Sequence, residues 1–182
     1  MFVPKFTITN RILVYISQIE AARAVISISP VIPSWESKFR KRAMEESVHH
    51  STALEGNHLT FEQFQEILDG SQEVIGAPHD IQEVLNYQEA LKFVDEVAGK
   101  DQFSLAMLLH IHRLLGGSGQ FRASQVVVRN TQTGEVSYTP PPAAEVPYLM
   151  EDLIRWISQS ESQQIHPVIK AAIVQYELSR IH

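Results

Sequence analysis

The sequence predicts a mainly α-helical fold of about eight helices with one β-hairpin. Apolar residues recur at helical spacing through most of the chain. Residues that commonly start or stop helices lie between these apolar stretches. Residues 125–138 depart from this pattern, because two β-branched runs there flank a turn-forming segment. The chain has 182 residues, 44% of them hydrophobic, so it can bury a sizeable core. No segment has the composition of a linker.

Four helices are predicted in the first 100 residues. Their expected spans are residues 10–29, 34–54, 61–69 and 81–98. The second helix has Gly56 just beyond its end, where glycine can adopt the left-handed conformation that stops a helix. The third and fourth helices each begin with the pattern of a capping box, formed by Thr60 with Gln63 and by Asp80 with Glu83.

The rest of the chain predicts three further helices and the hairpin. The helices are expected at residues 105–115, from about residue 145 onward, and from about residue 166 to the end. Gln125–Arg129 and Glu135–Tyr138 read as the two strands, and Asn130–Gly134 reads as the turn between them. Three prolines, Pro140 to Pro142, then end the strand pairing because proline has no N–H to donate.

Composition and charge exclude several classes of protein. The net charge of −6 argues against a nucleic-acid binder, and the one basic cluster, residues 38–42, reads as a solvated helix face beside glutamates. The absence of cysteine excludes disulfides and thiolate zinc sites. His110 and His112 face apart on a helix, so no metal site is predicted. No apolar run reaches the ~18 residues of a membrane span, so we expect no membrane insertion and a cytoplasmic protein.

The last predicted helix has no stop signal. Residues 177–182 contain none of the Gly, Asn or Pro residues that commonly end a helix. We interpret this as a truncation of a longer helix or loop, and a frayed natural terminus is the alternative.

Three segments, in this order along the chain, resemble the Fic family. They are Ser51–Asn57, with Ser, three residues, Glu and Gly; residues 119–150, from Gly119-Gln120-Phe121-Arg122 to Leu149-Met150; and residues 166–182, from His166-Pro167 to Ile181-His182. The resemblance is to the subgroup that carries an inhibitory helix before its catalytic core. It implies a Fic-type helical bundle with an N-terminal region, residues 1–100, that contains the inhibitory helix at about 34–56. Residues 101–182 would then form a Fic core that is truncated at the start of its catalytic loop.

The resemblance assigns an inhibitory role to Glu55. In the family this carboxylate pairs with an arginine of the signature loop that would otherwise hold the γ-phosphate of ATP, in a two-point geometry. ATP then binds with its triphosphate misaligned for attack at the α-phosphorus. Ser51, one turn earlier on the same helix face, can steady Glu55, and Gly56 ends the helix. The alternative interpretation is an ordinary helix end with a solvated glutamate.

His182 takes the position of the family's general base. An imidazole suits this task because its unperturbed pKa of about 6.5 lies near working pH. Only the histidine of the family signature His-Pro-Phe-x-x-Gly-Asn-Gly-Arg is present here. The phosphate-cradling amides, the Mg²⁺-binding acid and the arginines of that signature follow this histidine in the family. We therefore expect the 182-residue polypeptide alone to be inactive.

The hairpin resembles the family's target-positioning flap. Its candidate edge is Val126, Val127, Val128 and Arg129, which can pair with an extended target segment and present a hydroxyl to the base. A surface hairpin without this role is the alternative.

The implied function is transfer of AMP from ATP, with Mg²⁺, to a Ser, Thr or Tyr hydroxyl of a target protein. The implied partners are ATP and a hydroxyl-bearing protein, and the resemblance is compatible with a homodimer. The rival hypothesis is a non-catalytic protein-binding module derived from a Fic domain. The residues that follow His182 would discriminate between the two.

Overall fold

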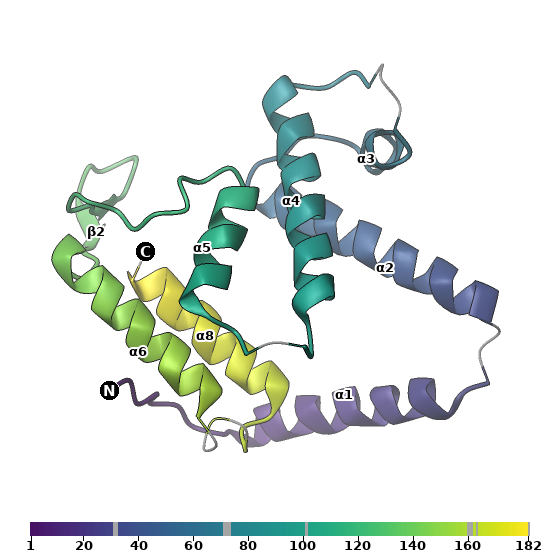
Figure 1. The fold of residues 1–182 in the computed structure, drawn as a ribbon, viewed down its shortest axis with the longest axis horizontal. Coiled ribbons are helices and arrows are strands. Elements are labelled where there is room, and N and C mark those ends of the chain that lie inside the picture. The colour runs from purple at the N-terminus through teal and green to yellow at the C-terminus, as the bar shows by residue number, and fades with distance from the viewer. Residues whose placement is uncertain (31–32, 71–73, 101, 160–161, 163, 182) are drawn as a thin grey trace. The chain divides into compact units, whose positions relative to one another are not determined.

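The computed structural model describes residues 1–30, 33–70, 74–100, 102–159, 162 and 164–181. These residues form seven α-helices, one 3-10 helix and one two-stranded antiparallel sheet, which confirms the predicted mainly helical fold with a hairpin (Figure 1). The elements are α1 (Asn10–Ile28), α2 (Pro33–Leu54), α3 (Phe61–Leu68), α4 (Pro78–Val97), α5 (Leu105–Leu114), β1 (Val128–Arg129), β2 (Val136–Tyr138), η1 (Ala143–Glu145), α6 (Val146–Ser158) and α8 (Pro167–Ile181). Within the described ranges, no helix is both long and apolar enough to cross a membrane.

The chain divides into two compact units. The first unit contains Met1–Ala22, Gln102–Leu109 and Gly119–His182, and the second contains Arg23–Asp101 and His110–Ser118. The predicted division into regions 1–100 and 101–182 concerns the family's domains and stays a prediction.

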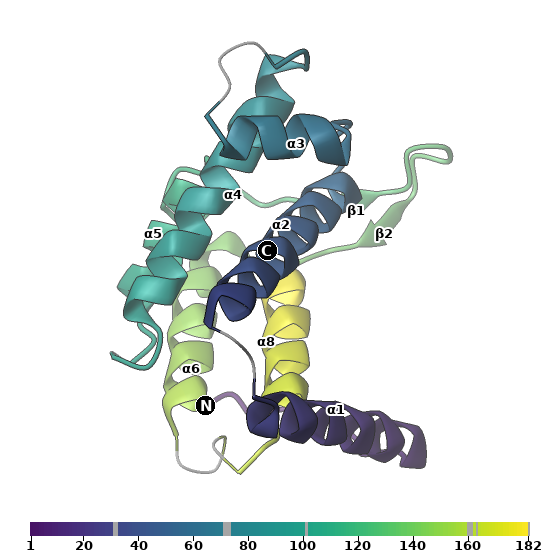
Figure 2. The same ribbon diagram turned by 90° about the vertical axis from the view of Figure 1, so that its right-hand side faces the viewer.

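Helices α2, α3 and α4 pack together around the core of the second unit (Figure 2). The buried core side chains are Val48, Leu59, Phe64, Ile67 and Val84. Phe61 stacks on Phe64 with ring centroids 6.0 Å apart, and His49 lies edge-on to both rings. Burial of this apolar surface fixes the C-terminal half of α2, so the residues that follow it start from a rigid support.

The starts of α3 and α4 differ from each other. Thr60 and Gln63 form the predicted capping box, with Thr60 N–H donating to Gln63 Oε1 at 2.8 Å and Gln63 N–H to Thr60 Oγ1 at 3.3 Å. The capping box predicted at Asp80 is wrong, because α4 already begins at Pro78 and has no side-chain cap. Proline at the first helical position has no N–H to satisfy and a preset φ, so a side-chain cap is dispensable there.

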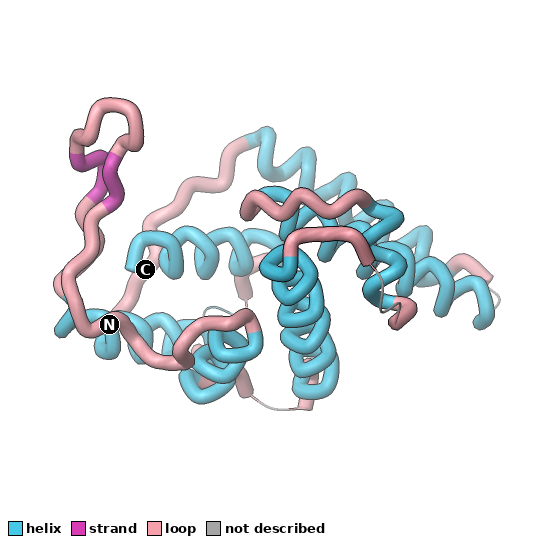
Figure 3. Tube along the Cα trace, turned by 90° about the horizontal axis from the view of Figure 1, so that it is seen from above, coloured by secondary structure: helices cyan, strands magenta, loops and turns pink. Residues whose placement is uncertain are grey.

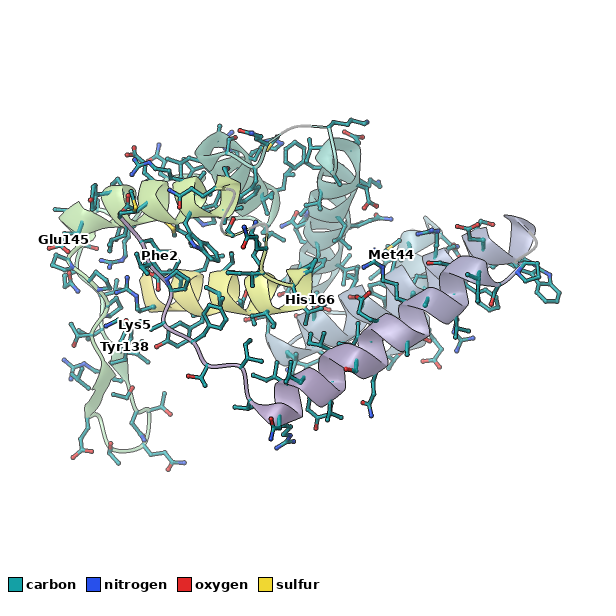
Figure 4. All side chains as sticks on the ribbon, turned by 90° about the horizontal axis from the view of Figure 1, so that it is seen from below. Phe2, Lys5, Met44, Tyr138, Glu145 and His166 are labelled. Carbon is teal, nitrogen blue, oxygen red and sulfur yellow. The ribbon has the colours of Figure 1, made fainter. Side chains whose placement is uncertain are left out.

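Helices α6 and α8 lie side by side in the first unit and supply its core (Figure 1). The buried core side chains are Val146, Met150, Leu153, Trp156 and Ile181. Phe2, labelled in Figure 4, meets the Trp156 ring edge-to-face at 5.4 Å. The Met1 amino group pairs with Asp152 at 2.8 Å and lowers the pKa of that carboxyl through its hydrogen bond and its charge.

The hairpin also belongs to the first unit, and Figure 3 shows its two short strands joined by a loop. Val128 pairs with Tyr138 and Arg129 with Val136, with an irregularity between them. Asn130 N–H donates to the Glu135 carbonyl at 2.9 Å and closes the turn. The first strand is shorter than the predicted Gln125–Arg129, because the strand opposite runs into prolines that cannot continue a ladder.

Candidate functional site

Glu55 directly follows α2 and occupies the C-cap position of a Schellman motif. The N–H of Asn57 donates to the Thr52 carbonyl at 3.1 Å, and the N–H of Gly56 donates to the Ala53 carbonyl at 3.2 Å. Gly56 has a φ of +100°, which confirms it as the left-handed stop of the helix. The motif fixes the path of the backbone on both sides of Glu55.

Asn57 ties this turn to the start of α4. Its side chain is 8% exposed, and its amide donates to the Asp80 carbonyl at 2.9 Å and to Glu83 Oε2 at 2.8 Å. Its Oδ1 accepts from the Leu59 N–H at 3.1 Å. The neighbouring His58 N–H donates to Asp80 Oδ2 at 3.1 Å. The turn that carries Glu55 is therefore held by hydrogen bonds rather than by apolar packing.

The Glu55 side chain itself is exposed, and within the described residues its carboxylate has no hydrogen bond and no ion pair. The last turn of α2 carries no basic residue. The carbonyl end of a helix has a partial negative charge, so a carboxylate there is disfavoured by roughly 0.3–1 kcal/mol unless a cation meets it. The end of α2 thus presents, on a fixed turn, a negative charge that no cation among the described residues compensates.

Ser51 lies one turn before Glu55 on α2 and is half-buried. Among the described residues its hydroxyl makes no hydrogen bond, to Glu55 or to another group. The hydroxyl that is engaged is that of the buried Thr52, which donates to the Val48 carbonyl at 3.1 Å. The supporting role of Ser51 stays a prediction.

The C-terminal end of α8 is closed by side chains from around the hairpin. The Tyr138 hydroxyl, on β2 and labelled in Figure 4, donates to the Arg180 carbonyl at 2.7 Å. The Arg122 guanidinium donates to the Ile181 carbonyl at 3.4 Å and also to the Pro141 carbonyl. The last carbonyls of a helix lack partners within it, and a cation at this end also interacts favourably with the helix dipole. The base of the hairpin is thereby fastened to the end of α8.

Two further interactions hold the same end of α8. Ile181 is fully buried in the core that α8 shares with α6. Arg180 donates through Nε and Nη2 to both carboxylate oxygens of Glu177, at 2.9 and 2.6 Å, and this hydrogen bonding raises the pKa of the guanidinium. His182, the predicted general base, lies outside the described residues. The structure thus shows how Arg180 and Ile181, the two residues before His182, are held in place.

The predicted flap edge is open to solvent. Val126, Val127, Val128 and Arg129 are all exposed, and β1 has one partner strand in the described part of the chain. The Gln125 amide donates to the Pro140 carbonyl at 3.0 Å and braces the base of the hairpin. Such an edge offers N–H and C=O groups with which an extended peptide can pair.

The candidate residues form two groups, one in each unit. Ser51, Glu55 and Gly56 belong to the second unit, and the flap and the end of α8 belong to the first. Across the described residues, no three His, Asp or Glu side chains are placed to hold a metal ion.

These features define a class of mainly helical proteins with one β-hairpin. In this class the hairpin is hydrogen-bonded to the end of a helix, and a candidate general base follows that helix. Residues 102–182 match the Fic/DOC family, and this part of the chain belongs to that family. The match lies outside α2, so membership of the inhibitory-helix subgroup stays a prediction.

Similar proteins are known from animals and bacteria. The chain is 28% identical over 175 residues to "Protein adenylyltransferase Fic" of Drosophila willistoni, an alignment that covers 92% of this chain and 34% of that protein. The protein of the same name from Drosophila melanogaster is 30% identical over 151 residues, or 79% of this chain and 29% of the relative. The crystal structure of a Fic family protein from Desulfovibrio desulfuricans G20 has a TM-score of 0.79 at 28% identity, and covers 100% of this chain and 54% of its own. The chain therefore spans about a third of the length of these curated relatives.

The sequence predicted no role for Asn57, Arg122 and Tyr138, and it predicted for Glu83 a capping box with Asp80 instead of its hydrogen bond with Asn57. Arg122 and Tyr138 lie inside the flap segment that resembles the family, but they contact the end of α8, 59 and 42 positions away respectively. The sequence gives little reason to predict that Asn57 is buried, since a polar residue just after a helix-stopping glycine is often solvated. No local sequence pattern distinguishes a buried asparagine from a solvated one at this position.

Proposed function

We propose that the complete protein, this chain together with a catalytic loop after His182, transfers AMP from ATP to a Ser, Thr or Tyr hydroxyl of a protein. The observation that carries this proposal is the match of residues 102–182 to the Fic/DOC family. The similar proteins called "Protein adenylyltransferase Fic" support AMP transfer as the reaction class, which implies ATP and a protein target.

His182 acts in this proposal as the general base. The target hydroxyl gives its proton to the imidazole, and its oxygen forms a bond to the α-phosphorus of ATP. The bond from that phosphorus to the bridging oxygen breaks, and pyrophosphate leaves. The support for placing the base here is the anchored end of α8, where Arg122 and Tyr138 restrain the two carbonyls just before it. Such restraint favours catalysis because misplacement of a reacting group by about 1 Å can cost on the order of a hundredfold in rate.

Glu55 inhibits the reaction in this proposal by pairing with an arginine of the loop after His182. That arginine then cannot hold the terminal phosphate of ATP. The support is electrostatic: the Glu55 carboxylate lies at the negative end of α2, and no described residue compensates its charge. A guanidinium is the cation that matches a carboxylate with two hydrogen bonds.

Mg²⁺ enters the proposal through the family resemblance. Among the described residues, no three His, Asp or Glu side chains are placed to hold a metal ion, and Mg²⁺ needs only one or two carboxylates together with the phosphates of ATP. Its ligands would come from the segment after His182, so none of the steps above runs through the metal.

We place the protein in the cytoplasm, since a chain without cysteine is compatible with a reducing compartment. A homodimer is compatible with the proposal. Sedimentation of the complete protein would measure its mass in solution and so show whether it is a dimer.

The test is incubation of the complete protein and its Glu55→Gly variant with α-labelled ATP, Mg²⁺ and a cell lysate that contains the target. We expect label on protein, and more of it with Glu55→Gly, because the arginine is then free to hold ATP. The 182-residue polypeptide should transfer no label. If the Glu55→Gly form labels no protein, the non-catalytic binding module is the better description, and its partner would bind through the hairpin.

A further inference from the structure

We propose that Asn57 and Glu83 form a latch that holds Glu55 in its inhibitory position. This inference rests on the proposed self-inhibition and names the part of the protein that sets its strength. The latch is the buried amide of Asn57 together with the Glu83 carboxylate and the Asp80 carbonyl that accept its hydrogen bonds at 2.8 and 2.9 Å.

The turn that carries Glu55 is anchored by buried residues on either side of it. Residues 53–56 are all exposed, and Leu54 within them is 88% exposed. A Cβ added at Gly56 would meet nothing within 4 Å, so no packing restrains the turn from that side. The buried residues on either side are Thr52, inside α2, and Asn57, beyond the turn. The position of Glu55 is therefore set by one anchor in its own helix and one in α4.

The anchor in α4 is strong because its acceptor is charged. The hydrogen bond from Asn57 to Glu83 has an ionised acceptor, and such bonds are shorter and stronger than those between neutral groups. The N–H of Asn57 also closes the Schellman motif at the Thr52 carbonyl. A displacement of Asn57 consequently changes the backbone on both sides of Gly56, and Glu55 moves with it.

Loss of this anchor should change the activity of the complete protein. In a latch, loss of the Asn57–Glu83 hydrogen bond lets the turn leave its inhibitory position for part of the time. Loss of one hydrogen bond to a charged group shifts such an equilibrium by about tenfold or more. The complete protein should then become more active. A residue with a merely structural role would lower activity or leave it unchanged when removed.

The experiment compares Glu83→Ala and Asn57→Ala with wild type in the complete protein, by initial rates of label transfer from α-labelled ATP. We expect both variants to raise the rate by about tenfold or more and to remain below Glu55→Gly. Glu83→Gln should restore most of the inhibition, because its Oε1 can still accept from Asn57. The matched control is Glu89→Ala, which removes the same charge from an exposed position of α4 where the glutamate pairs with Lys92.

A double variant separates the latch from an indirect effect. Glu83→Ala should add nothing in the Glu55→Gly background, since the inhibitor that it releases is already absent. If Glu55→Gly raises the rate while Glu83→Ala and Asn57→Ala, shown folded by thermal unfolding, leave it at the wild-type level, the latch is wrong and self-inhibition stands. If a rise persists in the double variant, the latch is likewise wrong. If Glu55→Gly itself brings no rise, the proposed self-inhibition fails, and the latch fails with it.

Discussion

The ends of α2 and α8 both precede residues with proposed roles, and they are closed in different ways. At the end of α2, the N–H groups of Gly56 and its successor bond back to carbonyls of the last helical turn. At the end of α8, the carbonyls of Arg180 and Ile181 accept from Tyr138 and Arg122, 42 and 59 residues away along the chain. The hydrogen bonds that close α2 lie within one turn and do not involve the Glu55 carboxylate. The hydrogen bonds that close α8 come from distant residues and tie this helix end to the hairpin. The two helix ends should therefore respond differently to substitution.

The largest difference is expected for the last apolar residue of each helix. Ile181→Ala should lower the free energy of unfolding by about 2–4 kcal/mol, because Ile181 is 0% exposed and truncation leaves a cavity. Leu54→Ala should change it by less than about 0.5 kcal/mol, since Leu54 is 88% exposed. Urea unfolding followed by circular dichroism measures both, and equal losses would contradict the comparison.

A smaller effect is expected at the glycine that closes α2. Gly56→Ala should cost about 1 kcal/mol of stability, because a φ of +100° is unfavourable for a residue with a Cβ. Space is available for the methyl group, so strain in the backbone is the whole cost. Gly56→Asn should cost less, since asparagine tolerates the left-handed region. The same urea titration checks the order, and an alanine variant as stable as wild type would show that the turn relaxes.

The smallest effect is expected at the hydroxyl that closes α8. Tyr138→Phe should lower the free energy of unfolding by roughly 0.5–1.5 kcal/mol, the net contribution of one hydrogen bond. Amide hydrogen exchange at the C-terminal end of α8 should speed up in this variant. Tyr148→Phe is the control, because Tyr148 is exposed and its hydroxyl has no hydrogen bond among the described residues. Unchanged exchange in Tyr138→Phe would mean that packing alone holds the end of α8.

The fold could be predicted further than the site. Periodicity and stop residues predicted α2, α3 and the hairpin, and the capping box at Thr60 is present as expected. The box expected at Asp80 failed because Pro78 begins α4 earlier, and Asp80 instead accepts from the His58 N–H. The first strand was predicted too long, since its length depends on the strand opposite. The length of the first strand thus depended on a partner elsewhere in the chain, whereas the failed capping box depended on Pro78, two residues before Asp80.

The sequence by itself determined the helices, the left-handed stop at Gly56 and the resemblance that assigns Glu55 and His182, because these follow from residue types at short, fixed spacings. The tertiary structure alone decided that Asn57 anchors to Glu83 and that Arg122 and Tyr138 close α8. The physical reason is that a hydrogen bond between distant residues is specified by the packing that brings donor and acceptor together. Residue type alone says that each of these side chains needs a partner, and the fold says which one it finds.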